Sequence, residues 1–521
     1  MAYLIGLDVG TTGCKAVVFT ETGRQAGSAY REYGIDTDSL GKAEQNAELV
    51  WSLCKEVLAG ATASAAKGHA GPLPVVALGL SVQGDAIIPL DASGAPLYPA
   101  ILGMDYRSAS QAQECEALFG GKDLFLRTGM RPHAMNSLCK VLWFRAEHPE
   151  LWVKTEHIVT YGDFIVSRLL GQTTGQYYID QTMASRTMAW NRACGDWDDA
   201  LLSDLSLSRR LFSTIVPSGK SLGHLDAGLA RSCGLPDSVV LVAGGHDQPC
   251  GAVGAGVRAE GDAVVSSGTA EVLSLVFPSD RRADALYDGY YPRYRSALPG
   301  LDFTFALNHV GGLLLRWYRD TWAATEVLQA EQEGKDAYAL IDESMPAGLS
   351  PVLFLPHLNG AGTPTCDPLS MGAVLGLTLA TTRGDVAKAI LEALTFELAL
   401  NVETLEHCGI FLKNLTAIGG GARSPLWLQM KADVLGMPIR TLECKEAACL
   451  GAAVIAGSGA GLYTSIIDGI DRCVRFGKTY EHDTSRSKAY AERFALYKEL
   501  HGTLRPLHEK LRLFTLWKMP N

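Results

Sequence analysis

The chain begins with an apolar run that is broken by a polar, glycine-rich turn. YLIGLDV (3–9) predicts a strand, GTTG predicts a turn and KAVVFT (15–20) predicts a second strand, so the three form a β-hairpin with a polar tip. The same order returns in GDAVVSSGTAEVLSLVF (261–277), where the tip again contains Gly-Thr. Two hairpins of one design so far apart predict two structurally related halves that face each other.

Segments with helical periodicity lie between these strands. Further strands are predicted in VVALGLSVQ (75–83) and NLTAIGGGARS (414–424). Helices are predicted at Glu48–Ala66, over most of 109–170, at Val386–Glu406, Pro425–Leu435 and 446–459, and at Arg486–Leu513 as an amphipathic surface helix. Alternating strands and helices predict an α/β protein, and 521 residues favour two large domains, which we place at 1–249 and 250–521.

The apolar run VVLVAGGHDQPCGAVGAG (239–256) ends in His246 and Asp247. A carboxylate just past the end of a buried strand lies where open α/β sheets bind their ligands, so Asp247 is a candidate for chemistry. His246 has no partner histidines at metal-ligand spacing, which favours a structural role beside Asp247. The glycines of GAVGAG have the wrong spacing for a dinucleotide fingerprint and indicate a tightly packed helix start.

The two hairpin tips are candidate phosphate sites. In DVGTTG, Asp8 ends a strand, and Gly10 and Gly13 let backbone N–H groups point outward to hold phosphate while Asp8 holds Mg²⁺. SSGTAE, with Thr269 at its tip, gives a second such loop. A plain hairpin turn is the alternative for both. The chain has no GxxxxGK[ST] motif, so any nucleotide is bound without a P-loop.

Three other strand ends have polar or glycine-rich residues. QGD (83–85) and MDYRS (104–108) offer the few polar side chains that would orient a small hydroxylated ligand. A surface ion pair is the alternative for Asp105 and Arg107. IGGGARS (418–424) would let the backbone lie flat against adenine, and a plain strand-to-helix turn is its alternative.

Composition excludes several classes of function. A formal charge of −10 with no basic run argues against nucleic acid as a partner. No stretch reaches 18 apolar residues, so we expect no membrane span. No basic segment precedes the first apolar run, so we expect no signal peptide. We therefore expect a cytoplasmic protein. Twelve scattered cysteines without a CxxC pair predict reduced thiols in the core.

Taken in order, these motifs resemble the FGGY carbohydrate kinases. DVGTTG, QGD, MDYRS, GGHDQPCGAVGAG, SSGTAE, FLPHLNGAGTP, GGGARSPLWLQMKADVLGMPI and EAACLGAA extend over nearly the whole chain. The resemblance implies two RNase H-like domains of the actin-like ATPase type that close over a deep cleft. It also implies ATP with Mg²⁺ held mainly by the C-terminal half and sugar held mainly by the N-terminal half.

The resemblance also assigns roles to residues. It makes Asp247 the catalytic base and Asp8 the carboxylate associated with Mg²⁺. It places ATP at Thr11, Thr12, Lys15, Gly268, Thr269, Gly311, Gly420, Gly421 and Ala422. It places the sugar at Gln83, Asp85, Asp105 and Arg107, beside Asp247. A base so placed would take the proton of a sugar hydroxyl as its oxygen attacks the γ-phosphorus in line.

Departures from the family pattern bear on the substrate. Gly84–Asp85 and MDYR stand where xylulose kinases have Met-His and Asn-Asp-Gly-Arg, and the Arg-Glu pair of glycerol kinases is missing. The aromatic residue often found before the matching Lys140 is absent, and FLPHLNGAGTP lacks Glu-Arg after its glycine. Since Asp85 would accept from a hydroxyl, we expect a neutral ketopentose such as xylulose. A kinase of another polyol or hexulose and a non-catalytic sensor are the alternatives, and the family suggests a homodimer.

Overall fold

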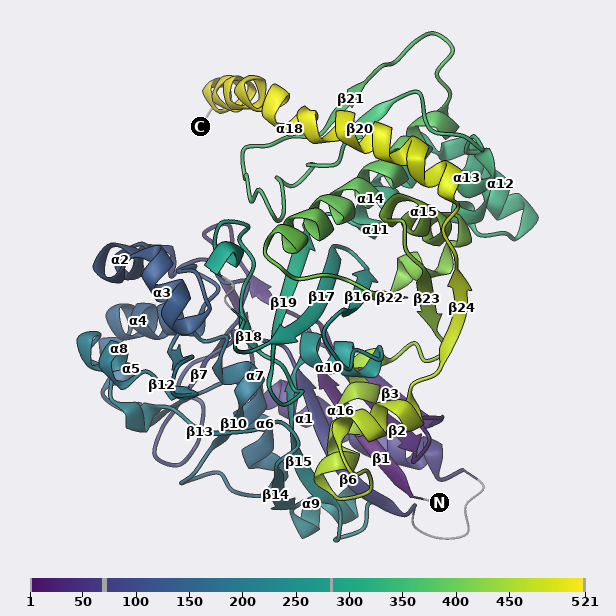
Figure 1. The fold of residues 1–521 in the computed structure, drawn as a ribbon. Coiled ribbons are helices and arrows are strands. Elements are labelled where there is room, and N and C mark those ends of the chain that lie inside the picture. Colours follow the sequence, from purple (N-terminus) through teal and green to yellow (C-terminus); the bar gives the residue numbers. More distant parts are fainter. Residues whose placement is uncertain (1, 68–72, 282–283, 519–521) are drawn as a thin grey trace.

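The computed structural model describes residues 2–67, 73–281 and 284–518, which form two sheet-containing halves (Figure 1). The N-terminal half holds a six-stranded sheet in which β1, β2 and β3 are antiparallel neighbours. On the other side of β1, β6 and β15 continue the sheet in the parallel direction. In spatial order its strands are β14 (Ser221–His224), β15 (Val240–His246), β6 (Val75–Val82), β1 (Tyr3–Val9), β2 (Gly13–Thr20) and β3 (Gln25–Glu32).

The C-terminal half repeats this topology in a seven-stranded sheet. Here β16, β17 and β19 are antiparallel neighbours, and β22 and β23 continue in parallel on the other side of β16. The order is β18 (Tyr294–Arg295), β19 (Leu301–Asn308), β17 (Glu271–Pro278), β16 (Asp262–Ser267), β22 (Asn414–Ile418), β23 (Ile439–Leu442) and β24 (Phe476–Tyr480). The equal strand order confirms the two related halves that the repeated hairpin predicts.

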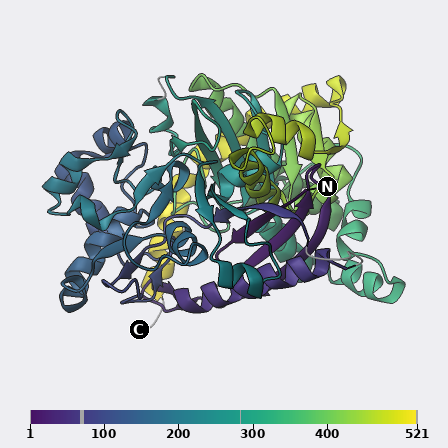
Figure 2. The same ribbon diagram turned by 90° about the horizontal axis from the view of Figure 1, so that it is seen from below.

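The predicted helices form close to their expected bounds. In the N-terminal half the helices are α1 (Ala47–Ala65), α2 (Ala109–Phe119), α3 (Gly121–Thr128), α4 (Ser137–Glu147), α5 (Pro149–Trp152), α6 (Tyr161–Leu169), α7 (Gln181–Ala184), α8 (Asp199–Asp204), α9 (Ala227–Ser232) and α10 (Asp247–Gly254). The C-terminal half has α11 (Gly312–Trp322), α12 (Ala324–Glu333), α13 (Ala337–Ser344), α14 (Arg383–His407), α15 (Pro425–Leu435), α16 (Ala447–Gly459), α17 (Ile466–Cys473) and α18 (Thr484–Lys518). Seen from below, the purple helix α1 lies along the N-terminal sheet (Figure 2). The blue helices of 109–170 form a lobe beside this sheet.

Four short strand pairs and one small three-stranded sheet complete the described structure. Their strands are β4 (Asp36–Thr37), β5 (Ala43–Gln45), β7 (Ile88–Leu90), β8 (Ala100–Ile101), β9 (His157–Val159), β10 (Tyr178–Asp180), β11 (Trp190–Asn191), β12 (Asp196–Trp197), β13 (Thr214–Val216), β20 (Leu353–Leu355) and β21 (Ala373–Leu375). Single 3-10 turns lie at Arg209–Leu211, Asp284–Leu286 and Gly420–Arg423.

Two helices join the halves. Although α16 lies in sequence between β23 and β24 of the C-terminal sheet, it packs on β1 and β6 of the N-terminal sheet and against α10. Glycines permit this close approach, because a Cβ at Gly254 would lie 1.9 Å from the carbonyl oxygen of Ala447, and one at Gly451 would lie 1.8 Å from that of Cys250. The close packing predicted for GAVGAG is therefore confirmed at Gly254, whereas the predicted helix start is wrong, because α10 begins at Asp247 and ends at Gly254. The predicted domain boundary at 249/250 falls inside α10.

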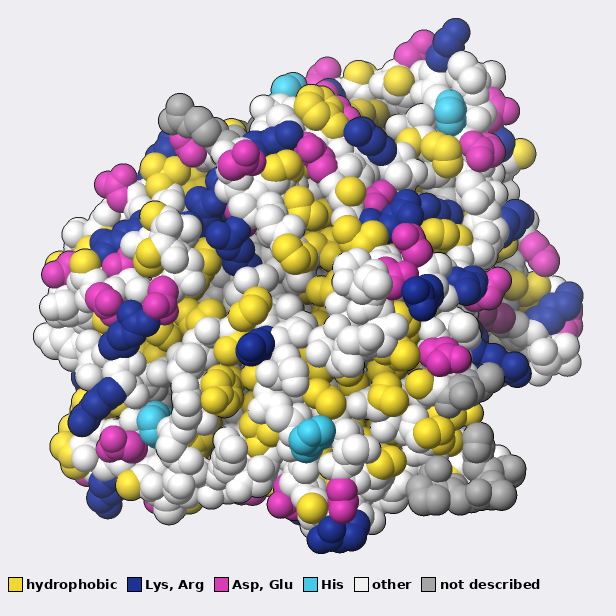
Figure 3. Space-filling view, turned by 60° about the horizontal axis from the view of Figure 1, so that its bottom comes forward, with side chains coloured by type: hydrophobic (Ala, Val, Ile, Leu, Met, Phe, Trp, Pro, Cys, Tyr) yellow, Lys and Arg dark blue, Asp and Glu magenta, His cyan; other side chains and the backbone are white. Residues whose placement is uncertain are grey.

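Three observations on the described residues bear on the expectations from composition. No helix among them is long and apolar enough to cross a membrane. On the face drawn in Figure 3, basic and acidic side chains are interspersed. All twelve cysteines are free thiols, and eight are buried, whereas Cys194 is exposed and Cys366, Cys408 and Cys444 are half-buried. The prediction that they are core residues is thus wrong for Cys194, which lies in the exposed turn between β11 and β12.

Candidate active site

Asp8 and Asp247 lie at the same edge of the N-terminal sheet. Strands β1 and β15 flank β6 and run parallel to it, so Asp8 on β1 and Asp247 just past β15 both lie at carboxyl ends of strands. Ser81 on β6 donates to Oδ1 of Asp8 at 2.6 Å. The residue after Asp247, Gln248, contacts Ser274 of β17 at 3.3 Å, which places the pair where the two sheets meet.

The surroundings of both carboxylates favour their protonated forms. Burial raises the pKa of Asp8 to about 6, although the Ser81 hydroxyl lowers it. Burial raises the pKa of Asp247 to about 7, and the negative charge of Asp8 raises it further, whereas Arg186 opposes the shift. About 36% of the Asp247 side chain is still exposed, so it faces an open space and not a dry interior. A carboxylate with a pKa near neutrality is suited to accept and release a proton.

His246 orients the carboxylate of Asp247. Its Nε2 lies 3.1 Å from Oδ1 of Asp247, its Nδ1 faces the Tyr294 hydroxyl at 3.4 Å, and its backbone N–H donates to Thr182. Burial and the Arg186 charge hold the His246 pKa well below its usual range, so the ring is neutral. This agrees with the structural role expected for His246.

The tip of the first hairpin is held in place by hydrogen bonds of 2.6–3.1 Å, which its backbone carbonyl oxygens accept from three neighbouring residues. The acceptors are Gly10, Thr11 and Thr12, and the donors are Tyr33, Gln45 and Gln83. In a trans peptide the N–H points opposite to the preceding C=O. The N–H groups of Thr11 and Thr12 therefore point away from the protein body, as an anion site requires.

The second hairpin has the same arrangement, with the start of α11 as donor. The carbonyl oxygen of Gly268 accepts from Gly312 N at 2.7 Å, and that of Thr269 accepts from Gly311 N at 2.8 Å. Close packing explains the paired glycines, because a Cβ at Gly311 would lie 2.8 Å from the backbone of Ala270. The N–H groups of Thr269 and Ala270 are left pointing outward.

A cavity of about 450 Å³ adjoins the second hairpin. Of the residues predicted to bind ATP, Gly268, Thr269, Gly420 and Gly421 line it. Ala422 packs against the neighbouring apolar core instead. A Cβ at Gly421 would lie 2.6 Å from both the Ser267 Cβ and the Trp427 ring, so this turn fits only a glycine. The volume is in the range of small-ligand sites.

Lys15 makes a bidentate ion pair across the two halves. Its Nζ donates to the two carboxylate oxygens of Glu446 at 2.9 and 3.0 Å, just before α16 begins. The Glu446 carboxylate raises the pKa of Lys15 against the effect of burial, so the side chain stays charged. Its predicted role in ATP binding remains a prediction.

The polar side chains that follow the carboxyl end of β6 already have hydrogen-bond or ion-pair partners within the protein. The Gln83 amide donates to Gly10 O and to Gln45, so it supports the first hairpin from behind. Asp85, in a left-handed conformation with φ of 65°, forms a buried ion pair with Arg186. The Arg186 guanidinium donates to both oxygens of this carboxylate, and the expected role of Asp85 as an acceptor for a sugar hydroxyl stays a prediction.

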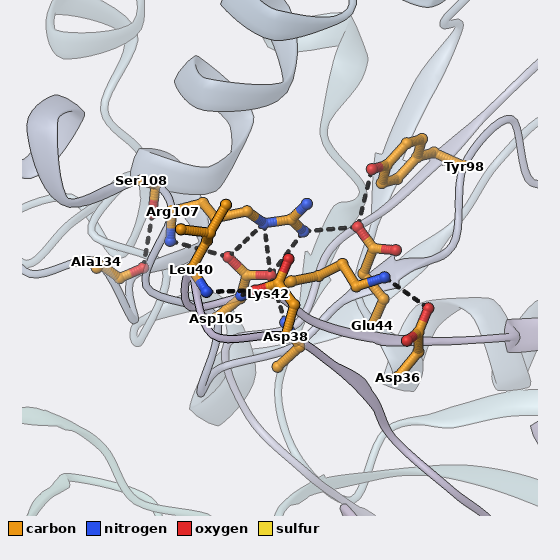
Figure 4. A network of polar contacts seen from close by, with 11 residues as sticks. Asp36, Asp38, Leu40, Lys42, Glu44, Tyr98, Asp105, Arg107, Ser108 and Ala134 are labelled. Atoms are coloured by element: carbon orange, nitrogen blue, oxygen red, sulfur yellow. Dashed lines mark hydrogen bonds and ion pairs between the residues drawn. The ribbon is translucent and has the colours of Figure 1, made fainter. Parts of the chain in front are cut away.

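Asp105 and Arg107 form a buried network with Glu44 (Figure 4). Arg107 donates to both carboxylates at 2.6 Å and lies over the Trp143 ring, and Asp105 accepts from the Ala43 N–H at 2.8 Å. The ion pair considered as the alternative for these two residues is thus present, although it is buried and not on the surface. It ties the strand around Ala43 to the MDYRS turn.

Two basic residues that were not among the predicted site residues lie near Asp85. Arg186 is buried over the Tyr294 and Phe305 rings, and its Nη1 has no hydrogen-bond partner in the described part of the chain. Lys140 is buried, donates to Met135 O, and has a pKa lowered to about 8 by burial. A sequence signal for such residues is a single basic residue within a run of small or apolar residues, as Arg186 within MASRTMAW, because a charged residue in a buried segment needs a partner.

Within the described ranges, no group of three or more His, Cys, Asp or Glu side chains is placed to hold a metal ion. A lone carboxylate such as Asp8 fits Mg²⁺ that is bound mainly by substrate phosphates and water. The donor set therefore suits a metal that arrives with the nucleotide.

Comparisons with known proteins decide the family. The N-terminal and C-terminal domain models of the FGGY family of carbohydrate kinases match residues 3–254 and 263–460. The chain belongs to the FGGY family of carbohydrate kinases. It is 26% identical over 514 residues to a xylulose kinase of Bacillus subtilis, with 99% of each chain covered. It is 28% identical over 504 residues to a gluconokinase of Bacillus licheniformis, covering 94% of this chain and 93% of that one.

A solved xylulose kinase from Rhodospirillum rubrum superposes with a TM-score of 0.86 at 25% identity, covering 97% of this chain and 100% of that one. The chain is thus an FGGY carbohydrate kinase, a phosphotransferase with an alcohol group as acceptor, on an actin-like ATPase fold. Family membership confirms the predicted enzyme class and leaves the individual substrate open, because the relatives act on different sugars.

Proposed function

We propose that this kinase transfers the γ-phosphoryl group of ATP to a hydroxyl of a neutral ketopentose such as xylulose, with Asp247 as general base. One observation carries the proposal: Asp247 lies at the strand end beside Asp8, where the two sheets meet, and its side chain is open to solvent. The xylulose kinases among the relatives support the choice of a ketopentose.

The residues present suit an in-line transfer. Asp247 takes the proton of the acceptor hydroxyl while that oxygen bonds to the γ-phosphorus and the bond to the ADP oxygen breaks. His246 holds Oδ1 of Asp247 at 3.1 Å, which leaves Oδ2 to face the hydroxyl. Outward N–H groups at Thr11 and Thr269 would neutralise charge on the transferring group.

Asp8 is the residue that would hold Mg²⁺, directly or through water. When bound, the metal supplies charge neutralisation at the phosphates. Ser81 fixes the orientation of Asp8 by donating to one of its oxygens at 2.6 Å.

Charge balance around Asp247 favours a neutral substrate. Arg186 is neutralised by Asp85, and Arg107 is neutralised by Asp105 and Glu44. A carboxylate substrate would therefore meet two further acids, Asp8 and Asp247, with few unpaired cations to offset the repulsion.

A second candidate is an aldonate such as gluconate, and Lys140 favours it. Its buried ammonium faces a backbone carbonyl and has no ion pair among the described contacts. A buried, unpaired cation is costly, and a substrate carboxylate would stabilise it. The similarity to a gluconokinase fits this alternative.

An ADP-release assay with xylulose, ribulose, xylitol and gluconate distinguishes the candidates. We expect xylulose to give the highest kcat/KM, and K140M to reduce gluconate turnover more than xylulose turnover. Preference for gluconate would overturn the ketopentose assignment. Activity on none of a wider sugar panel would favour a non-catalytic sensor. The homodimer and the cytoplasmic location remain predictions.

A further inference from the structure

A buried ion pair lies beneath the second phosphate hairpin. Lys431 of α15 bonds to the carboxylate of Glu271, and it donates to the Ser267 hydroxyl at 2.8 Å. Ser267 in turn donates to the same Glu271 oxygen at 2.5 Å. All three side chains are at most 2% exposed.

These contacts fix both ends of the hairpin tip. Ser267 ends β16, Glu271 begins β17, and the two residues are paired across the hairpin. The tip between them consists of Gly268, Thr269 and Ala270. Lys431 therefore holds the two positions from which the outward N–H groups are presented. A shift of this pair would move the tip directly, because only three residues separate its ends.

The free-energy cost of burying the Lys431–Glu271 ion pair indicates a role other than packing. Two charges taken out of water lose hydration energy that their attraction only partly returns, and hydrophobic replacements of equal volume are often as stable. In addition, Oε1 of Glu271 is buried without a hydrogen-bond partner in the described contacts. Such unsatisfied groups are rare in native structures and are retained where position matters.

The wall of the nucleotide cavity at Ser424 and Trp427 has hydrogen bonds of its own. Trp427 donates from Nε1 to Thr395 at 3.1 Å, and Ser424 caps α15 and donates to Asp342 at 2.7 Å. The Lys431 ammonium only lies over the Trp427 ring at 4.1 Å. The hydrogen bonds that hold Ser424 and Trp427 therefore do not involve Lys431.

We propose that Lys431 and Glu271 are positioning residues that hold the second hairpin in the geometry needed to grip the ATP phosphates. The proposal rests on the assignment of the cavity at Gly420 and Gly421 to the nucleotide. It assigns to this pair an effect on binding of the ATP phosphates that is separate from binding of the adenine ring.

Binding of ATP and of adenosine to purified full-length variants tests this by calorimetry. In K431M we expect ATP affinity to fall about tenfold and adenosine affinity to stay within about twofold, because adenosine uses only the wall. KM for ATP should rise in parallel while KM for the sugar stays unchanged.

The double variant K431M/E271L separates positioning from stability. With both charges removed, thermal stability should return close to wild type, since no charge is left buried and unpaired. ATP affinity should stay about tenfold low, because no polar link fixes the tip. A double variant that binds ATP like wild type would overturn the proposal, and equal losses of ATP and adenosine would do the same.

E397Q serves as the matched control. Glu397 is a buried carboxylate of the same domain that contacts His357 and Tyr497 on the side of α14 facing α18. Its loss should lower stability and leave the ratio of ATP to adenosine affinity unchanged. If wild type itself binds neither ligand, the assignment of the nucleotide cavity fails, which is distinct from failure of the positioning proposal.

Discussion

Asp8 and Asp247 extend from the ends of β1 and β15 with only β6 between them, and the charge of Asp8 helps to raise the pKa of Asp247 to about 7. Burial is the larger cause of this shift, and the negative charge of Asp8 makes ionisation of Asp247 more costly still. Mg²⁺ held by Asp8 together with the nucleotide would offset this repulsion by its positive charge. Binding of the metal would therefore favour the ionised form of Asp247.

Replacement of Asp247 tests the assignment of the base. D247N should lower kcat by about 10²- to 10⁴-fold and leave KM for the sugar within a few fold, because the amide cannot accept the hydroxyl proton. Steady-state kinetics measure both. D237N is a suitable control, since Asp237 lies near the start of β15 and pairs with an exposed arginine. A D247N enzyme with near-normal kcat would show that another group is the base.

The pH dependence follows from the pKa of Asp247. Below about pH 7 the base is protonated, so kcat/KM of wild type should fall about tenfold between pH 7 and 6, and more steeply below pH 6, where Asp8 is protonated as well. His246 is neutral throughout this range and should add no second limb. A pH–rate profile recorded from pH 5 to 9 gives the midpoint, and a flat profile across pH 7 would contradict the assignment.

The same pKa shift has a consequence for stability. The folded pKa of Asp247 is above its unfolded value, so the folded state binds the proton more tightly, and stability falls as pH rises from about 4 to 7. D247N removes this cost. Its melting temperature should exceed that of wild type above pH 7, with the difference vanishing as pH falls toward 4.

Gly421 tests the nucleotide cavity. In G421A the new Cβ would lie 2.6 Å from Ser267 and Trp427, so the hairpin and the wall must move apart. We expect KM for ATP to rise about tenfold and KM for the sugar to change less than twofold. G502A is the control, because nothing lies within 4 Å of a Cβ at Gly502. Equal changes in both KM values would indicate general misfolding.

The buried pair of Arg186 and Asp85 should affect both stability and chemistry. R186M leaves Asp85 buried without its partner, which costs about 3–5 kcal/mol of unfolding free energy. It also removes the positive charge that lowers the pKa of Asp247, so the acid limb of kcat/KM should move to higher pH. Urea unfolding and a pH–rate profile measure the two effects.

The exposed Arg209, which pairs with Asp196 and Asp199, provides the comparison. R209M should cost at most about 1 kcal/mol, because exposed ion pairs contribute little. It should leave the acid limb in place. An unchanged acid limb in R186M would argue against coupling between Arg186 and the base.

The sequence alone determined the class of fold, the repeated halves and the position of Asp247 at a strand end. These features follow from local periodicity and from glycine-rich turns, which are properties of neighbouring residues. The ordered motifs also indicated the family that the comparisons then confirmed.

Only the tertiary structure decided which polar groups are already paired. Asp85 and Gln83 were predicted to face substrate, yet Asp85 is held by Arg186, 101 residues away, and Gln83 supports Gly10, 73 residues away. The link from Lys431 to Glu271 likewise spans 160 residues. The physical reason is that a buried charge or amide takes its partner from whichever element packs against it, and sequence patterns describe neighbours along the chain and not neighbours in space.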